Sequence, residues 1–303
     1  MRRIIMCCCV VYLAGCSGGD DGQVTAQLDS LIQNMDIDTS TISNDVVDDI
    51  VKTVPSPLVM SSFLESTGAQ FSQTLLHDLD MSDDYASAFE MASNLGVYGA
   101  DLGYINVYKK NHIAVEYLNV IKRLADGLKV GQFFDFKTMK RMTSNQDNLD
   151  SLINITTRGF EDMDSYLKDK NRGVISALIL YGGWTEALYI ATQVISSMPD
   201  PPEDLMDRIG EQKMVLDNLE ALLSVYKQQP YFQELLTKMA PMKEAFAGVE
   251  ISVEEAESTL EEIDGVLTVV DHSKSNVAIT PNQFNGITVA IKNIRTHLTK
   301  QAP

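Results

Sequence analysis

The sequence predicts an all-α protein, a bundle of about nine helices with one fully buried central helix. Apolar residues recur at spacings of three and four through most of the chain after residue 57, as on the buried face of a helix. Few segments alternate apolar and polar residues as strands do. Residues 174–195 are apolar on nearly every face, which is typical of a helix buried on all sides.

The first residues of the chain have the composition of an export signal. A basic start, Met-Arg-Arg, precedes an apolar run over residues 4–13 that is too short to span a bilayer core. The motif Leu13-Ala14-Gly15-Cys16 resembles the lipobox of bacterial lipoproteins. This resemblance implies a signal peptide at 1–15, cleavage before Cys16 and acyl chains on Cys16 that anchor the protein in a membrane. A secreted protein cut near Gly15 without lipid is the alternative.

Cysteine content and charge restrict the function further. Three of the four cysteines lie in the leader, so acylation of Cys16 leaves no thiol for catalysis or disulfides. The net charge of −18 becomes −20 once Arg2 and Arg3 are removed. Nucleic acid binding requires clustered cations, so we expect no nucleic acid partner. Electrostatic attachment to anionic lipid is disfavoured for the same reason, and the acyl chains must supply the membrane contact.

Residues 16–54 are predicted to form a flexible acidic stalk. The polar, glycine-rich tract at 17–22 reads as a tether and resembles the acidic export signal after the cysteine of Bacteroidetes lipoproteins. Ser17 in place of Asp, by resemblance to enterobacterial sorting, favours the outer membrane. Asp29-Ser30-Leu31 resembles the sequence that Bacteroidetes O-glycosylate, which makes Ser30 a candidate site. Two prolines in Pro55-Ser56-Pro57 force extended backbone and place the start of a helical domain at 55–303.

Helices are expected over six segments of the first part of this domain. Ser82 is the expected N-cap of a long helix, with Asp83 and Asp84 in its first turn. The six segments are 58–65, 69–77, 82–110, 114–128, 149–167 and 174–195. The last could be mistaken for a transmembrane helix, but Glu186 at its middle would be costly in lipid. We therefore predict that it forms the core of the bundle.

Prolines divide the second part of the domain. Pro199-Asp200-Pro201-Pro202 is a break and a possible boundary between subdomains at 199–202. A helix over 205–226 follows; Pro230 kinks or restarts it, and Pro241 interrupts the next. Ser252 and Glu255 form a capping-box pattern before apolar residues that continue to position 270, which predicts a further helix. Thr280-Pro281 opens the last helix, over 281–298.

Residues 94–104 carry three glycines within eight positions, and two interpretations remain open. Gly96, Ala100 and Gly103 share one helical face, where Gly182 and Gly183 could pack closely as a helix crossing. Alternatively, polar residues beside the crossing line a small-ligand pocket, with Trp184 and Glu186 opposite. These polar residues are Asn94, Tyr98, Asp101 and Tyr104. The stretch is similar to one in uncharacterised Bacteroidetes lipoproteins, which implies a fold and no activity. Residues 94–128 loosely suggest a tetratricopeptide unit, but the register does not recur.

A calcium loop is the strongest metal candidate in the sequence. Asp78, Asp80 and Ser82 match its positions 1, 3 and 5, but position 6 is Asp83 rather than glycine. An acidic helix cap explains the same residues. The four histidines are scattered, and sequence signatures of zinc, nucleotide and serine-hydrolase sites are missing. We therefore expect no cofactor.

Together these observations predict a non-enzymatic lipoprotein of the outer membrane. The helical domain would act as an interaction or envelope-support module and bind an envelope protein partner. The alternative is a small-ligand-binding protein that uses the Asn94–Tyr104 helix face.

Overall fold

The computed structural model describes residues 53–134, 158–159, 162–254, 259–263, 266–270 and 274–300. The chain is mostly helical and forms a multi-helix bundle, so the predicted fold class is confirmed. The predicted leader, the stalk up to residue 52, Cys16 and Ser30 lie outside the described residues.

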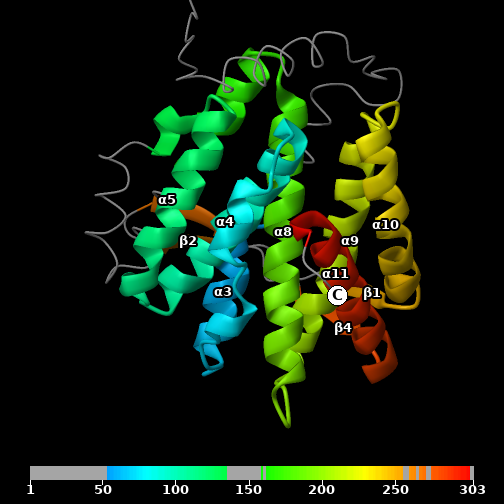
Figure 1. Ribbon diagram of the computed structural model, residues 1–303. Helices are drawn as coiled ribbons and strands as arrows, with labels where there is room; N and C mark the ends of the chain where they lie inside the picture. The colour runs from blue at the N-terminus through cyan, green and yellow to red at the C-terminus, as the bar shows by residue number, and fades with distance from the viewer. Residues whose placement is uncertain are drawn as a thin grey trace, which may run out of the picture.

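The elements follow one another from an N-terminal helix to a C-terminal helix (Figure 1). In chain order they are α3 (Pro57–Ser66), η1 (Gln73–Leu75), η2 (Leu79–Asp83), α4 (Ala88–Val107), α5 (Asn111–Gly127), η3 (Gly131–Phe134), α8 (Gly173–Ser196), α9 (Glu203–Ser224), α10 (Pro230–Phe246), β1 (Glu250–Glu254), β2 (Thr259–Ile263), β3 (Val266–Val270), β4 (Lys274–Ala278) and α11 (Pro281–Thr299). Residues 162–169 are also helical.

Helix α8 is the centre of the bundle, as predicted. It runs the length of the molecule beside α4, with α3 against both helices and α5 on the outer side of α4 (Figure 1). Among the described helices, α8 alone is long and apolar enough to cross a membrane, but most of it is buried inside the protein. Its apolar surface is therefore covered by neighbouring helices, which is the arrangement of a core helix.

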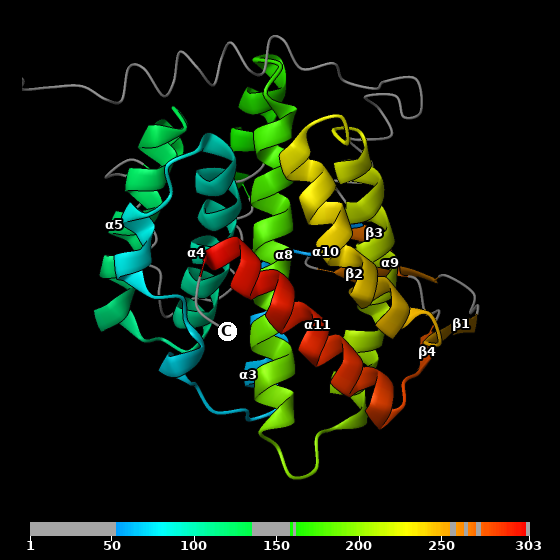
Figure 2. The ribbon, with the colours of Figure 1, turned by 45° about the vertical axis from the view of Figure 1, so that its right-hand side comes forward.

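The other side of α8 is covered by the last third of the chain. Helix α11 crosses α8 obliquely and packs on α10, which lies beside α9 (Figure 2). One hydrophobic core extends from Val54 to Leu298 and includes residues of every described α-helix. Val54, which the sequence assigned to the stalk, is 8% exposed and belongs to this core. Helices on both sides of the break at 199–202 contribute to the same core.

The glycine-rich face of α4 forms the predicted close crossing with α8. A Cβ atom on Gly96 would lie 2.0 Å from the carbonyl oxygen of Ile179, and one on Gly182 would lie 1.8 Å from that of Ser93. Both distances are far below van der Waals contact, so side chains at either position would push the backbones apart. Gly103 instead faces Leu58 of α3.

Residues 69–77 do not form the predicted helix. Only the single 3₁₀ turn η1 occurs there, and Leu76 is extended. The backbone N–H groups of Ser72 and His77 donate to the side chains of Tyr104 and Asp101, at 3.0 Å each. Since α4 side chains satisfy these backbone groups, the segment has no need of helical hydrogen bonds.

The long helix after this segment begins later than predicted. Ser87, not Ser82, is the N-cap of α4, where Ser87 and Glu90 form a capping box. Ser82 lies in η2, where its hydroxyl donates to the Leu79 carbonyl and accepts from Arg123. The acidic residues near Ser82 therefore belong to a separate turn and not to the first turn of α4.

The predicted helix after Ser252 is wrong. Strand β1 pairs with β4 and β2 pairs with β3, each antiparallel. Asp264-Gly265 separates the paired residues Ile263 and Val266, and this dipeptide is a strong hairpin signal. The three-four apolar spacing of the segment coexists with β-branched residues, which favour strands.

Three predictions about the C-terminal helices have different outcomes. Helix α10 restarts at Pro230 as expected but continues through Pro241. Met239, Met242 and Phe246 are buried on both sides of this proline, and their packing holds the helix together. The Thr280–Gln283 capping box at the start of α11 is confirmed.

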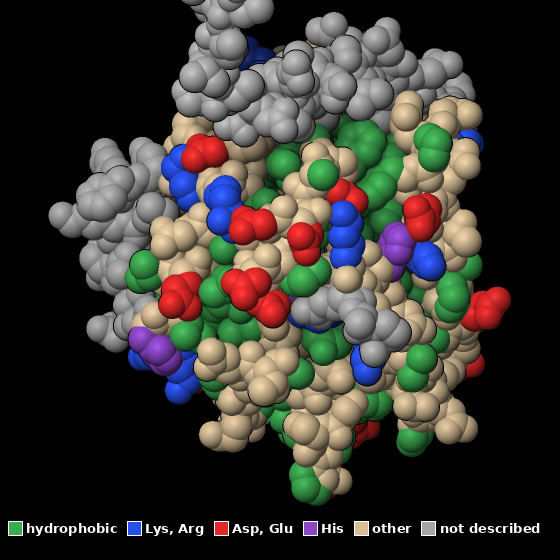
Figure 3. All heavy atoms as spheres, in the orientation of Figure 1, with side chains coloured by type: hydrophobic (Ala, Val, Ile, Leu, Met, Phe, Trp, Pro, Cys, Tyr) green, Lys and Arg blue, Asp and Glu red, His purple; other side chains and the backbone are tan. Residues whose placement is uncertain are grey.

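Acidic and basic side chains are interspersed over the face of the molecule in Figure 3. The exposed ion pairs of the described residues include Lys122 with Asp126 and Arg123 with Asp83. Exposed pairs of this kind contribute little to stability.

Candidate functional site

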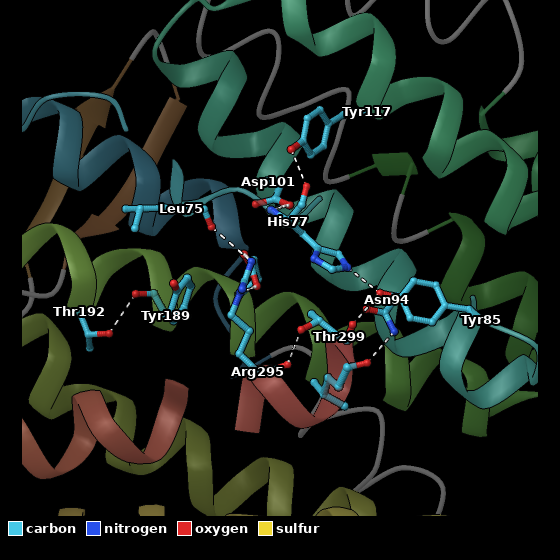
Figure 4. A network of polar contacts seen from close by, with 12 residues as sticks. Leu75, His77, Tyr85, Asn94, Asp101, Tyr117, Tyr189, Thr192, Arg295 and Thr299 are labelled. Carbon is cyan, nitrogen blue, oxygen red and sulfur yellow. Dashed lines mark hydrogen bonds and ion pairs between the residues drawn. The ribbon is translucent and has the colours of Figure 1, made fainter. Parts of the chain in front are cut away.

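The six residues predicted to line a ligand pocket are all inside the protein. Their exposed fractions are 3% for Trp184 and 0% for the other five, which are Asn94, Tyr98, Asp101, Tyr104 and Glu186. Helix α4 carries four of them and α8 carries two. Five make polar contacts between α4, α8, α11 and the segment before α4. Figure 4 shows the part of this network around Asn94 and Asp101.

Asp101 binds the irregular segment before α4. Its Oδ2 accepts the backbone N–H of His77 at 3.0 Å, and the His77 carbonyl accepts the hydroxyl of Tyr117 at 2.7 Å (Figure 4). Asp101 of α4 and Tyr117 of α5 thus bind the main-chain N–H and the carbonyl of His77. The second oxygen of Asp101, Oδ1, is buried and has no protein donor.

Glu186 forms a bidentate ion pair with Arg295 of α11. Nε of Arg295 donates to Oε2 at 2.7 Å, and a terminal nitrogen donates to Oε1 at 2.9 Å. The side chains are 0% and 6% exposed, respectively. The guanidinium also donates to the Leu75 carbonyl at 3.3 Å and lies 4.2 Å from the centre of the Tyr189 ring. Arg295 therefore joins α8 and α11 to the turn η1.

Burial and the neighbouring charges together set the pKa values of Asp101 and Arg295. Burial is the largest cause that raises the pKa of Asp101 well above its ordinary value, and the Glu186 charge raises it further against Arg295. Burial disfavours the charged form of Arg295, but the charge and hydrogen bonds of Glu186, together with Asp101 and Tyr189, raise the pKa of Arg295 overall. The guanidinium therefore stays charged, while Asp101 keeps its proton to higher pH than an exposed aspartate does.

His77 is a neutral imidazole in this environment. Burial, assisted by the charge of Arg295, lowers the pKa of His77 to about 3. Its Nε2 is hydrogen-bonded to the hydroxyl of Tyr85 at 2.5 Å, and its ring centre lies 4.8 Å from that of Tyr98. The ring therefore serves as an uncharged packing group that also makes a polar contact with Tyr85.

The remaining residues of the α4 face bind main-chain atoms. Nδ2 of Asn94 donates to the Leu298 carbonyl at 3.0 Å, near the C-terminus of α11. The Tyr98 hydroxyl donates to the Asp78 carbonyl at 2.6 Å, and the Tyr104 hydroxyl accepts from the Ser72 N–H. These contacts attach the segment before α4 and the end of α11 to one helix face.

Trp184 is not part of this group. Its Nε1 donates to Oε1 of Gln212 on α9 at 3.1 Å, on another side of α8. The structure thus brings five of the six predicted residues together and separates the sixth. Sequence reasoning missed His77, Tyr117 and Arg295. Arg295 stands within the buried stripe of α11, beside Ile291 and Leu298, and an arginine in such a stripe signals a buried partner.

The predicted calcium-loop residues belong to the 3₁₀ turn η2 and its N-cap. Asp78 is the N-cap of η2 and accepts the backbone N–H of Asp80 at 3.0 Å. The Ser82 hydroxyl donates to the Leu79 carbonyl and accepts from Arg123. Within the part of the chain that the structure describes, no three His, Cys, Asp or Glu side chains are grouped to hold a metal ion.

A groove of about 530 Å³ lies beside strands β1 and β4, apart from the α4 face. Lys213 of α9 is at its wall and donates to the Val249 carbonyl at 2.6 Å. Its lining residues are Lys213, Ala247, Val249, Glu250, Ile251, Ser252, Asn276, Val277 and Ala278.

Comparison of the chain with protein-family models, curated proteins and solved structures finds no match. The role of the buried polar face of α4, formed by Asn94, Tyr98, Asp101 and Tyr104, is therefore inferred from its contacts. Each of its predicted polar residues holds a part of the chain that is distant in sequence, between 20 residues away for Tyr98 and 204 for Asn94.

Proposed function

We propose that the protein is a bacterial lipoprotein of the outer membrane, anchored by acyl chains on Cys16, whose helical body is a non-enzymatic interaction module. The observation that carries the proposal is the motif Leu13-Ala14-Gly15-Cys16 directly after a short basic and apolar leader. In this proposal an envelope protein is the partner of the helical body.

The position of the folded body is compatible with an anchor at Cys16. The described structure begins at Thr53, whose hydroxyl accepts from Nδ2 of Asn218 on α9. Residues 17–52 thus lie between the acylated cysteine and the body and serve as the proposed stalk. The charge of −18 supports attachment through lipid rather than through anionic headgroups, since an acidic surface is repelled by them.

A structural role for the buried polar residues supports the non-enzymatic part of the proposal. Asp101, Tyr98 and Tyr104 contact the main chain of the segment that covers them, between Ser72 and Asp78. A small ligand could reach this face only if that segment moved away and gave up these hydrogen bonds. The alternative proposal of a small-ligand site therefore requires a large rearrangement, while the interaction module requires none.

The anchor is tested by comparing the wild type with Cys16→Ser in a bacterial host that processes lipoproteins. The wild type is expected to incorporate an alkyne-tagged fatty acid and to enter the detergent phase on Triton X-114 separation. Cys16→Ser is expected to lose the label and enter the aqueous phase. Equal label and equal partition of the two proteins would overturn the proposed anchor.

The interaction role is tested by crosslinking in intact cells, followed by purification. A matched control joins residues 1–52 to a fluorescent protein, which keeps the anchor and removes the helical body. A partner captured by the full chain and not by the control supports an interaction module. Identical captures by both proteins would contradict this role, because they would reflect location in the membrane alone.

A further inference from the structure

The buried polar cluster contains more acid than base. Asp101 and Glu186 are both 0% exposed and lie within hydrogen-bonding reach of one another, and Arg295 is the cation that faces them. Arg295 is bound in bidentate fashion to Glu186. Two ionised carboxylates beside one guanidinium would leave a net negative charge in a water-excluded site, which is costly.

The hydrogen-bond geometry shows which carboxyl group is the neutral one. Both oxygens of Glu186 accept from Arg295, so Glu186 has the contacts of a carboxylate. Oδ2 of Asp101 accepts from the His77 N–H, whereas its Oδ1 has no donor. A buried oxygen without a donor and beside another carboxylate is satisfied if it carries a proton and donates it.

We infer that Asp101 is a neutral carboxylic acid in the folded protein and donates its Oδ1 proton to Glu186, so that one buried proton stabilises the contact between α4, α8 and the Ser72–Asp78 segment. Loss of this proton in alkaline solution places two carboxylates side by side and weakens that contact. The inference concerns the helical body and does not depend on the anchor at Cys16.

The groups that face Asp101 are consistent with this assignment. The pKa of Asp101 is raised first by burial and then by Glu186, and Arg295 opposes these effects without overcoming them. Asp101 also acts on three uncharged phenols, Tyr98 of α4, Tyr117 of α5 and Tyr189 of α8. His77, whose backbone N–H binds Asp101, is likewise neutral because its pKa is lowered to about 3.

The sign of the pH dependence follows from the raised pKa. The unfolded chain releases the Asp101 proton near the ordinary value of 3.8, whereas the folded chain keeps it to higher pH. Between these two values the folded state binds one more proton than the unfolded state. Stability from this group is therefore fully present below about pH 4 and is lost as the pH rises, by about tenfold in the unfolding constant per pH unit.

Asp101→Asn is the sharpest test because asparagine imitates the neutral acid. Its amide oxygen can accept from His77, and its amide nitrogen can donate to Glu186. Between pH 5 and pH 8, the unfolding constant of the wild type is expected to rise relative to that of the variant, by at most about tenfold per pH unit. Asp83→Asn, at an exposed ion pair, is the matched control. Equal changes in the wild type and Asp101→Asn would overturn the inference.

A second measurement uses the wild-type full chain alone and does not require the variant to fold. Carboxyl carbons of aspartate are labelled with ¹³C and followed by NMR from pH 5 to pH 8. One resonance is expected to keep the position of a protonated acid at pH values where the other aspartates have the shift of a carboxylate. If every aspartate of the folded chain already has the chemical shift of a carboxylate at pH 5, the inference is wrong.

Discussion

Replacement of Glu186 by glutamine tests the most deeply buried ion pair among the described residues. Glu186→Gln removes one charge and at least one of the two hydrogen bonds to Arg295, which are 2.7 and 2.9 Å long. It leaves the guanidinium, with a side chain 6% exposed, without its counter-charge. Breaking a buried pair from one side costs about 3–5 kcal/mol.

A compensating effect places the expected loss near the lower end of this range. Without the repulsion from Glu186, Asp101 can ionise and act as a new counter-charge for Arg295, since both charges act on Asp101. We therefore expect a loss of about 3 kcal/mol for Glu186→Gln. The double variant Glu186→Gln, Asp101→Asn has no carboxylate that could replace Glu186 beside Arg295. Its free energy of unfolding is expected to fall by about 5 kcal/mol.

Urea denaturation followed by circular dichroism and by the fluorescence of Trp184, the single tryptophan, measures these losses. In a chain of this size a loss of about 3 kcal/mol lowers the Tm by roughly 6–12 °C. The matched control is Asp83→Asn, which breaks an exposed ion pair and costs about 0–1 kcal/mol. A loss below about 1 kcal/mol for Glu186→Gln, equal to that of the control, would refute the reasoning.

Two further predictions concern packing and pH. Gly96→Ala places a Cβ atom 2.0 Å from the Ile179 carbonyl oxygen, and we expect it to lower the free energy of unfolding in urea by more than about 2 kcal/mol. The control Gly286→Ala makes an ordinary contact of 3.4 Å and is expected to be neutral or stabilising. Similar losses for the two variants would contradict a tight α4–α8 crossing. The pKa of His77 is lowered to about 3 in the folded state, so below pH 6.5 only the unfolded state takes up a proton at this residue. From pH 6.5 to 4.5 the free energy of unfolding of the wild type is therefore expected to fall by about 2–3 kcal/mol more than that of His77→Gln. Parallel pH profiles of the two proteins would show that His77 is protonated in the folded state.

The parts of the fold that were predicted correctly are those whose signals are local. Helix α8 is apolar all round, and α11 begins with a Thr-Pro-Asn-Gln sequence that satisfies its own first backbone groups. The helix predicted over 69–77 is wrong because side chains from further along the chain bind its backbone N–H groups. Asp101 binds His77, 24 residues before it, and Tyr104 binds Ser72, 32 residues before it. Propensity within a short window contains no information about such partners.

The strands at 250–278 were missed for a different reason. Apolar residues at Val253, Leu260, Ile263, Leu267 and Val270 fit a helical stripe, but three of the intervening residues at 266–269 are also apolar or β-branched. The Asp264-Gly265 dipeptide was the local signal that could have decided between the two structures.

The candidate site was predicted in part. Asn94, Tyr98, Asp101 and Tyr104 share one face of α4, and helical spacing is sufficient to group them with Glu186 across the glycine crossing. Arg295 could not be placed beside Glu186, because 109 residues separate them and no pattern in the sequence links the two. Without that cation, the carboxylates resembled a ligand site rather than an internal ion pair.

Mass spectrometry of the N-terminal peptide from protein extracted out of bacterial membranes tests the proposed anchor most directly. We predict a chain that begins at Cys16 and carries the mass of acyl chains on that residue. A peptide that begins elsewhere, or Cys16 with an unmodified thiol, would contradict it.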